Sequence, residues 1–322
     1  MPAFLCSFLP FAHKVVIAAI PCCLTDKGAY RGEVLMTIIH TLPLLIRDGA
    51  HREHDIAMLV TGLSSLCASA ERQLVVYNQG CLNNGELRSL LAALGLPDAA
   101  VLGNGDNAGI APARQACFEY IWRTHPDVSY ISEIHVDMLF PPNWYDPLIA
   151  YIEQTGEPMA APGIVTAFGE LQPVGEFRPV PTQVEAMVEL LVSLARDEAM
   201  EGFVHPCVHR ASALREVGGY DTALLRGKQG YEDDSLLLGY LYYMGTRTNW
   251  RPKCCLRSWV YHATMAQRMA MTDKAEQFRM NEEGLFRQYG VYGLRHLAKL
   301  HRNPQSFEPL IRKYMALGGH EP

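Results

Sequence analysis

A histidine and an aspartate two residues apart, His135 and Asp137, form the first pattern in this sequence that could do chemistry. They follow residues 128–134, which we interpret as a buried strand, and Pro141-Pro142 prevents its continuation. In an open α/β sheet, ligands bind just outside the carboxyl ends of the strands. Side chains at alternate strand positions point to the same side, so this pair could share a divalent cation that holds a diphosphate. A local role, in which Asp137 caps a turn, fits the pattern equally well.

A run of three acids, Glu232, Asp233 and Asp234, opens an apolar segment with helical character. The helix dipole alone favours carboxylates in a first helical turn, so the run has a purely structural explanation. However, Gly227 and Gly230 lie just before it, and a glycine-rich loop that leads to a carboxylate suits the presentation of a general base beside a ligand. The spacing supports both interpretations.

Other histidines could complete a metal site. His262 follows a short apolar run and precedes a polar loop, so it could be a third metal ligand, although a lone histidine is more often structural. His205 and His209 are four residues apart, but Pro206 and the strand-like run around them argue against the helix that such a zinc-binding pair requires. We therefore interpret His205 and His209 as structural residues.

A glycine- and asparagine-rich turn, residues 103–109, precedes a helix and offers a candidate anion site. Asn107 and Gly109 could form a nest of backbone amides, and Arg114 could reach a phosphate. The spacing matches neither the G-x-G-x-x-G pattern of dinucleotide-binding folds nor the P-loop, which argues against both classes. The alternative is an ordinary turn followed by a solvated arginine. The sequence also lacks the G-x-S-x-G pattern of serine hydrolases.

The elements that position these residues belong to a chain of 322 residues, near the upper limit for a single hydrophobic core. A net charge of −6 gives no indication of a nucleic-acid partner or a polybasic membrane surface. The nine cysteines include no C-x-x-C pair, so a reduced, cytosolic compartment fits best. The apolar N-terminal stretch lacks a preceding basic residue and is too short to span a membrane, and no later run is long enough either.

Strands and helices alternate through the first part of the chain, which predicts a parallel sheet built from right-handed βαβ units. Strands are expected at residues 14–20, 73–77, 100–102, 128–134, 159–164, 203–208 and 259–262. Helices are expected at residues 33–46, 84–94, 112–124, 145–155, 184–195, 211–217 and 232–244, and again after residue 263. Asn84 is the expected N-cap of its helix, residues 54–61 fit either element, and residues 166–182 and 224–230 are expected to be loops.

In their order along the chain, these motifs resemble those of GT-A-fold glycosyltransferases, specifically family 2 and its relatives. The likeness covers about residues 14–290. Its most specific part is the pair formed by R-A-S-A-L-R-E-V-G-G-Y-D, residues 210–221, and G-Y-E-D-D, residues 230–234, because two separated motifs match in sequence and spacing. The segments N-A-G-I-A-P-A-R, residues 107–114, and H-V-D, residues 135–137, accompany this pair.

The resemblance implies roles for the reactive groups. Asp137 is similar to the last acid of a D-x-D motif that binds Mn²⁺ or Mg²⁺ on the diphosphate of a nucleotide sugar, and His135 stands where the first aspartate is usual. His262 is similar to the histidine that completes the metal site in some members. Asp233 resembles the general base that deprotonates the acceptor, with its neighbours Glu232 and Asp234 as the fallbacks.

The resemblance also implies a donor-binding side. In the family, an acidic pair after the second core strand usually holds the base and ribose, and here that pair is Asn78-Gln79, so the nucleotide stays open. The residues implied to bind the donor are Pro21, Arg31, Asn78, Asn107, Arg114 and His135.

The fold implied is a GT-A, Rossmann-like α/β fold, with a mostly parallel central sheet flanked by helices. A catalytic domain would span residues 1–262, with a donor half at about 14–140 and an acceptor half at about 141–262, and a C-terminal helical extension would span residues 263–322. The implied activity moves a sugar from a nucleotide-diphospho-sugar to an acceptor hydroxyl, with a divalent metal. A single base opposite the leaving group favours inversion.

The expected acceptor is a glycan, a lipid-linked molecule or a small molecule, recognised by the loop 166–182 and the helices after residue 263. We expect a cytoplasmic protein, which could also lie at a membrane surface. One alternative is a nucleotidyltransferase, although residues 22–28 lack the glycine-rich basic loop that this class carries after its first strand. The other is a non-catalytic module that binds nucleotide sugars on a decayed scaffold, which the substitution by His135 favours and the intact E-D-D run opposes.

Overall fold

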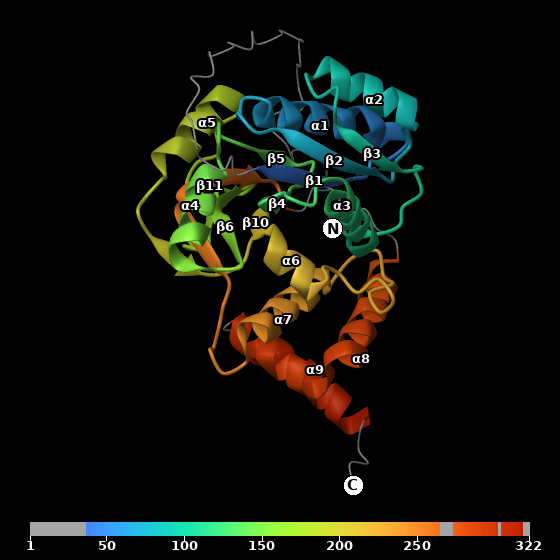
Figure 1. Cartoon of the computed structure of the whole chain (residues 1–322), viewed down its shortest axis with the longest axis vertical. Coiled ribbons are helices and arrows are strands. Elements are labelled where there is room, and N and C mark those ends of the chain that lie inside the picture. Colours follow the sequence, from blue (N-terminus) through green and yellow to red (C-terminus); the bar gives the residue numbers. More distant parts are fainter. Residues whose placement is uncertain (1–36, 265–272, 302–303, 318–322) are drawn as a thin grey trace, which may run out of the picture.

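The computed structural model of the chain describes residues 37–264, 273–301 and 304–317. They form a central β-sheet with helices on both faces, and a group of helices from the C-terminal part extends below one face (Figure 1). The structure therefore confirms the α/β class and the C-terminal helical part that the sequence predicts. None of the described helices is both long enough and apolar enough to cross a membrane.

The sheet follows the strand order β3-β2-β1-β4-β10-β6-β11-β5, and β7, β8 and β9 pair beside this path. Strands β1 to β4 pair with one another in parallel, and β6 pairs in parallel with β11. Strand β10 is antiparallel to both β4 and β6, so it joins the two parallel groups. The strands are β1 (Ile38–Leu44), β2 (Gln73–Asn78), β3 (Ala100–Gly103), β4 (Tyr130–Glu133), β5 (Met138–Leu139), β6 (Met159–Thr166), β7 (Glu170–Gln172), β8 (Glu176–Phe177), β9 (Ala199–Glu201), β10 (Cys207–Arg210) and β11 (Lys253–His262).

The helix predicted at residues 33–46 is wrong, because Ile38–Leu44 is the central strand β1. This strand pairs with β2 on one side and with β4 on the other, and six of its seven residues are buried. A strand that is buried on both faces has a nearly continuous apolar sequence, so hydrophobic spacing alone cannot distinguish it from a buried helix. The strand predicted at residues 14–20 lies outside the described residues, as do Pro21 and Arg31.

Helices pack against the two faces of the sheet through two separate apolar cores. Along a strand, successive side chains alternate between these cores: Leu74 and Val76 face one, and Val75 faces the other. The first core is covered by α1 (Arg52–Leu66), α2 (Asn84–Ala93) and α4 (Asp146–Thr155). The second is covered by α3 (Ile110–Thr124), α5 (Val184–Ser193), α6 (Ala211–Val217), α7 (Glu232–Met244), α8 (Lys274–Leu300) and α9 (Pro304–Leu317).

The structure decides one open local assignment and corrects two local predictions. Residues 54–61, which fit either element, belong to helix α1. The N-cap of α2 is Asn83, not Asn84, and Asn83 forms a capping box with Glu86. The expected loop at residues 166–182 contains the hairpin strands β7 and β8, which extend the sheet from β6.

Hydrogen bonds hold the glycine-containing loop 224–230 against the helices α8 and α3. On the side of α8, Asn281 accepts a hydrogen bond from the amide of Gly227 at 2.6 Å and donates one to the carbonyl of Gly230 at 2.7 Å. On the side of α3, the amide of Ile110 donates a hydrogen bond to the carbonyl of Lys228 at 3.0 Å. At Gly109, where φ is +93°, a Cβ would lie 2.7 Å from the Cα of Lys228, so only glycine fits this contact.

Candidate active site

A pocket of about 310 Å³ opens at one edge of the sheet. Its walls come from residues at the carboxyl ends of β1, β2, β4 and β11, from the residues that precede β10, and from the start of α7. This is the edge at which open α/β sheets bind ligands, and the volume lies at the lower end of the range of roughly 300–1,000 Å³ for small-molecule sites.

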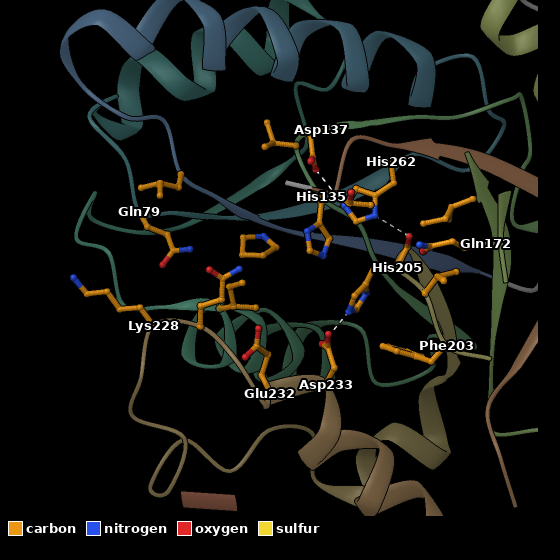
Figure 2. Close-up of a pocket in the computed structure, with 18 of the residues that line it drawn as sticks. Gln79, His135, Asp137, Gln172, Phe203, His205, Lys228, Glu232, Asp233 and His262 are labelled. Carbon is orange, nitrogen blue, oxygen red and sulfur yellow. Dashed lines mark hydrogen bonds and ion pairs between the residues drawn. The ribbon is translucent and has the colours of Figure 1, made fainter. Parts of the chain in front are cut away.

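Residues that are far apart in the sequence meet in this pocket, as the sequence predicts for Asp137, Asp233 and His262. Figure 2 shows Asp137 and His262 on one side of the pocket and Glu232 and Asp233 on the other. Figure 2 also shows the imidazole of His135 between the two sides. Asn107 lines the pocket as well. The fold therefore brings together a group of possible metal ligands and a pair of carboxylates around one cavity.

The possible metal ligands are His135, Asp137 and His262, which each offer one ligand atom within 4.8 Å of the others. The Nε2 atom of His262 lies 3.4 Å from Oδ1 of Asp137, and the rings of His135 and His262 have centroids 5.1 Å apart. Two imidazoles and one carboxylate form a donor set that suits first-row transition metals. Mg²⁺ and Ca²⁺ are typically bound by oxygen ligands alone.

The hydrogen bond on the other side of the His262 ring supports a cation site. Nδ1 of His262 lies 3.1 Å from the backbone carbonyl of His205. A carbonyl only accepts hydrogen bonds, so Nδ1 carries the proton, and in the neutral ring the lone pair of Nε2 then faces Asp137. Two acceptors that face each other repel unless a proton or a cation lies between them. Metal-binding histidines commonly donate their second N–H to a carbonyl in this way.

Asp233 is the carboxylate best placed for proton transfer. Its Oδ1 lies 2.9 Å from Nε2 of His205, and its side chain is 34% exposed. Burial alone would raise the pKa of Asp233, but His205 and then Arg114 lower it, so the pKa lies below its ordinary value. Asp233 is therefore ionised at neutral pH and able to accept a proton.

The start of α7 separates the three consecutive acids. Tyr231, which precedes the helix, adopts a left-handed conformation with φ of 61°. Consecutive helical residues then point in directions about 100° apart. Glu232 is buried and lines the pocket, Asp233 lines it beside His205, and Asp234 points to His301 at the end of α8, with Oδ1 and Nε2 2.7 Å apart. Asp234 does not line the pocket, so only Glu232 and Asp233 of this run can reach a ligand there.

Arg114, which we expected to reach a phosphate, does not line the pocket. Its side chain is fully buried, and Nε lies 2.8 Å from Oε2 of Glu133. Glu133 also interacts with Nε2 of His209 at 2.7 Å and accepts a hydrogen bond from the hydroxyl of Tyr220 at 2.8 Å. Arg114 is thus the counter-ion of a buried glutamate, and its expected contact with the donor is corrected.

Asn78 was also expected to bind the donor, but it does not line the pocket. Its side chain forms hydrogen bonds within the protein instead. Its amide donates to the carbonyl of Leu82 and to Oδ1 of Asn84, at 2.8 Å in each case. The expected donor contact of Asn78 is therefore corrected, because these bonds hold its side chain within its own loop. Its neighbour Gln79 does line the pocket, where Oε1 accepts a hydrogen bond from the amide of Gly109 at 3.1 Å.

Two ionisable side chains of the pocket, His205 and Lys228, were not predicted from the sequence to belong to the site. His205 was interpreted as structural, yet it lines the pocket and pairs with Asp233; the structural interpretation holds for His209, which is fully buried. Lys228 lines the pocket as well, and among the described residues that do so it alone carries a lysine or arginine charge. Its position in G-K-Q-G, which only Tyr231 separates from the E-D-D run, is the signal that could have identified it.

No family model matches the chain, and no curated protein matches it in sequence. Several solved structures align with part of its backbone. S. aureus TarS 1–349 in complex with UDP aligns with a TM-score of 0.46 and 13% identity over 82% of this chain and 70% of that chain. S. aureus TarS 1–349 in complex with UDP-GlcNAc aligns with a TM-score of 0.48 and 12% identity, over 88% of this chain and 76% of that chain. GalNAc-T7 with UDP, GalNAc and Mn²⁺ aligns with a TM-score of 0.44 and 13% identity, over 70% of this chain and 43% of that chain. These likenesses are modest, since all three TM-scores lie below 0.5 and the identities are 12–13%.

Proposed function

We propose that the protein is a metal-dependent glycosyltransferase that moves a sugar from a nucleotide-diphospho-sugar to an acceptor hydroxyl. The observation that carries this proposal is the arrangement of the pocket, in which Asp137 and His262 lie across the cavity from Asp233 and His135 lies between the two sides (Figure 2). One side could hold the charge of a leaving diphosphate, and the other could accept the proton of the attacking hydroxyl.

In this proposal, His135, Asp137 and His262 hold a divalent cation, and of Mn²⁺ and Mg²⁺ the two imidazoles favour Mn²⁺. When bound, the cation supplies positive charge where the leaving diphosphate develops negative charge. The nucleotide occupies the end of the pocket formed by Gln79 and Asn107, close to the carboxyl ends of β1 and β2. Lys228 adds a cation to this otherwise acidic and imidazole-rich cavity.

The acceptor side is formed by Asp233, with Glu232 as the alternative base. A carboxylate within hydrogen-bond reach of the acceptor hydroxyl removes its proton as the oxygen attacks the anomeric carbon. A single base opposite the leaving group favours inversion of configuration. Gln172, from the β7–β8 hairpin, lines the same pocket, which supports a part for this hairpin in binding the acceptor.

The test is a panel of nucleotide sugars with the full-length protein, with and without Mn²⁺. Thermal unfolding shows which donor binds, because a ligand that binds only the folded state raises its apparent stability. Release of nucleoside diphosphate then reports donor turnover, to water or to an added sugar acceptor. We expect one class of donor to bind and to turn over only with the metal.

The outcomes separate the rival functions. A nucleotidyltransferase would instead consume a nucleoside triphosphate and a sugar phosphate and release pyrophosphate. A non-catalytic module would be stabilised by a donor and would release no nucleoside diphosphate. Stabilisation by none of the donors, with or without metal, would refute both the transferase and the module.

A further inference from the structure

His205 contacts both functional groups of the pocket. Its imidazole Nε2 lies 2.9 Å from Oδ1 of Asp233, and its backbone carbonyl accepts the hydrogen bond from Nδ1 of His262 at 3.1 Å. Figure 2 shows His205 between Asp233 on one side and His262 on the other, with both interactions drawn as dashed lines. One residue therefore contacts the candidate base through its side chain and a candidate metal ligand through its main chain.

The imidazole of His205 is held in place from several directions. The side chain is only 9% exposed. Its ring lies edge-on to Phe203, with centroids 5.0 Å apart, and 4.9 Å from the ring of His135. Sγ of Cys207 lies 3.9 Å from Nδ1. Packing on these sides fixes the direction in which Nε2 points, and with it the position of the bond to Asp233.

Asp233 needs such a fixed partner more than the rest of the pocket does. Its side chain is 34% exposed at the start of a helix, so packing alone does not select one rotamer. A carboxylate that must meet a hydroxyl in one orientation loses rate when it can turn away, and a misplacement of about 1 Å can lower a rate about 100-fold.

We propose that His205 is a positioning residue for Asp233, an inference that rests on the proposed function. The N–H at Nε2 donates to Oδ1 and turns Oδ2 towards the acceptor hydroxyl. In the transfer step, the hydroxyl proton passes to Oδ2, the acceptor oxygen forms the new bond to the anomeric carbon, and the bond from that carbon to the diphosphate oxygen breaks. His205 gains and loses nothing in this step.

The two contacts of His205 allow the side-chain role to be isolated. A substitution removes the imidazole and leaves the carbonyl that holds His262, so metal affinity serves as an internal control. His205→Gln keeps an N–H donor close to the position of Nε2, because a glutamine amide extends about as far as the distal ring nitrogen. His205→Asn places its donor close to the position of Nδ1 and cannot reach Asp233.

The experiment measures transfer kinetics and Mn²⁺ affinity for the wild type, His205→Gln and His205→Asn, with the thermal unfolding of each protein as a check on folding. For His205→Asn we expect kcat to fall about 100-fold. The KM for the donor and the Mn²⁺ affinity should stay within about twofold of the wild type, since the imidazole is not itself a candidate ligand and the carbonyl that holds His262 is retained. His205→Gln should recover most of the lost kcat, which a loss of packing alone would not predict.

A double variant gives the sharper test. If His205 acts only through Asp233, adding His205→Asn to Asp233→Asn should cause no further loss, because residues that act as one unit are strongly non-additive. A double variant whose loss in kcat equals the product of the two single losses would overturn the inference. An unchanged kcat in His205→Asn, a Gln variant as slow as the Asn variant, or weakened Mn²⁺ binding would also overturn it. A wild type without any transfer would instead refute the proposed function, and the inference with it.

Discussion

Arg114 and Glu133 form an ion pair inside the protein, with Nε and Oε2 2.8 Å apart and both side chains fully buried. Burial alone would raise the pKa of Glu133, but Arg114 and His209 lower it to well below its ordinary value, so the carboxylate stays charged. Glu133 is the last residue of β4, directly before the segment that carries His135 and Asp137. The ion pair therefore fixes α3 to the strand end that delivers two of the candidate metal ligands.

Breaking this pair should destabilise the fold rather than weaken donor binding. In Arg114→Met, the carboxylate of Glu133 loses its counter-ion while it remains buried, and the loss of one partner of a buried pair lowers the free energy of unfolding by about 3–5 kcal/mol. Chemical denaturation at neutral pH measures this change. Arg279→Met, which removes exposed ion pairs on α8, is the matched control and should change stability little.

The alternative outcome for Arg114→Met would be equally informative. Unchanged stability combined with a large rise in the KM for the donor would return Arg114 to the phosphate-binding role that the family resemblance implies. The structure argues against that result, because the guanidinium is completely buried and does not line the pocket.

Asp137 and His262 could be placed at one site because ligand sites collect at the carboxyl ends of parallel strands, whereas Asp233, in the first turn of α7, was assigned to it from the family resemblance. His205 escaped this rule for a topological reason. Strand β10 is antiparallel to β4, and Cys207 at its beginning pairs with Glu133 at the end of β4. The residues just before β10 therefore reach the pocket, although a search at strand ends passes over them.

Two further errors arise from burial, which the local sequence does not reveal. The partner of Arg114 is Glu133, 19 residues away on another element, so nothing near the arginine indicates that it is buried. Strand β1 was mistaken for a helix because it is buried on both faces and has no alternation of polar and apolar residues. Both errors concern the centre of the sheet, where the tertiary neighbours decide the structure.

Removal of one candidate ligand should abolish the effect of metal on stability. With Mn²⁺ at about 100 times its dissociation constant, a single site adds about 2.7 kcal/mol to the stability of the folded protein. We expect Mn²⁺ to raise the unfolding temperature of the wild type and to leave that of Asp137→Asn unchanged, because an amide is a much weaker ligand than a carboxylate. Asp234→Asn is the control, since Asp234 lies outside the pocket and should leave the effect intact. An equal response of Asp137→Asn and the wild type would remove Asp137 from the site.

The three consecutive acids at the start of α7 should differ in their effect on turnover. Asp233→Asn should lower kcat about 10²- to 10⁴-fold, which is the usual contribution of a general acid or base. Asp234→Asn should change kcat by less than about tenfold on the same scale, because Asp234 is paired with His301 away from the pocket. Steady-state kinetics with a saturating donor measure both variants. A greater loss in Glu232→Gln than in Asp233→Asn would transfer the role of base to Glu232.

The contact between His301 and Asp234 should make the attachment of the C-terminal helices depend on pH. Nε2 of His301 and Oδ1 of Asp234 are 2.7 Å apart, so the end of α8 is fixed to the start of α7. Burial alone would lower the pKa of His301, but the hydrogen bond and charge of Asp234 raise it above 6.5. The folded protein thus binds a proton at His301 more tightly than the unfolded chain does.

The sign of the expected effect follows from this linkage. A raised pKa in the folded state contributes stability that is fully present below pH 6.5 and is lost as the pH rises through the folded-state pKa. His301→Gln should therefore lower the denaturation midpoint more at about pH 6 than at about pH 9, where histidine is neutral in both states. Asp234→Asn should remove the same pH-dependent difference, and the double variant should add nothing further. A loss in His301→Gln that is equal at both pH values would show that the contact acts as a neutral hydrogen bond only.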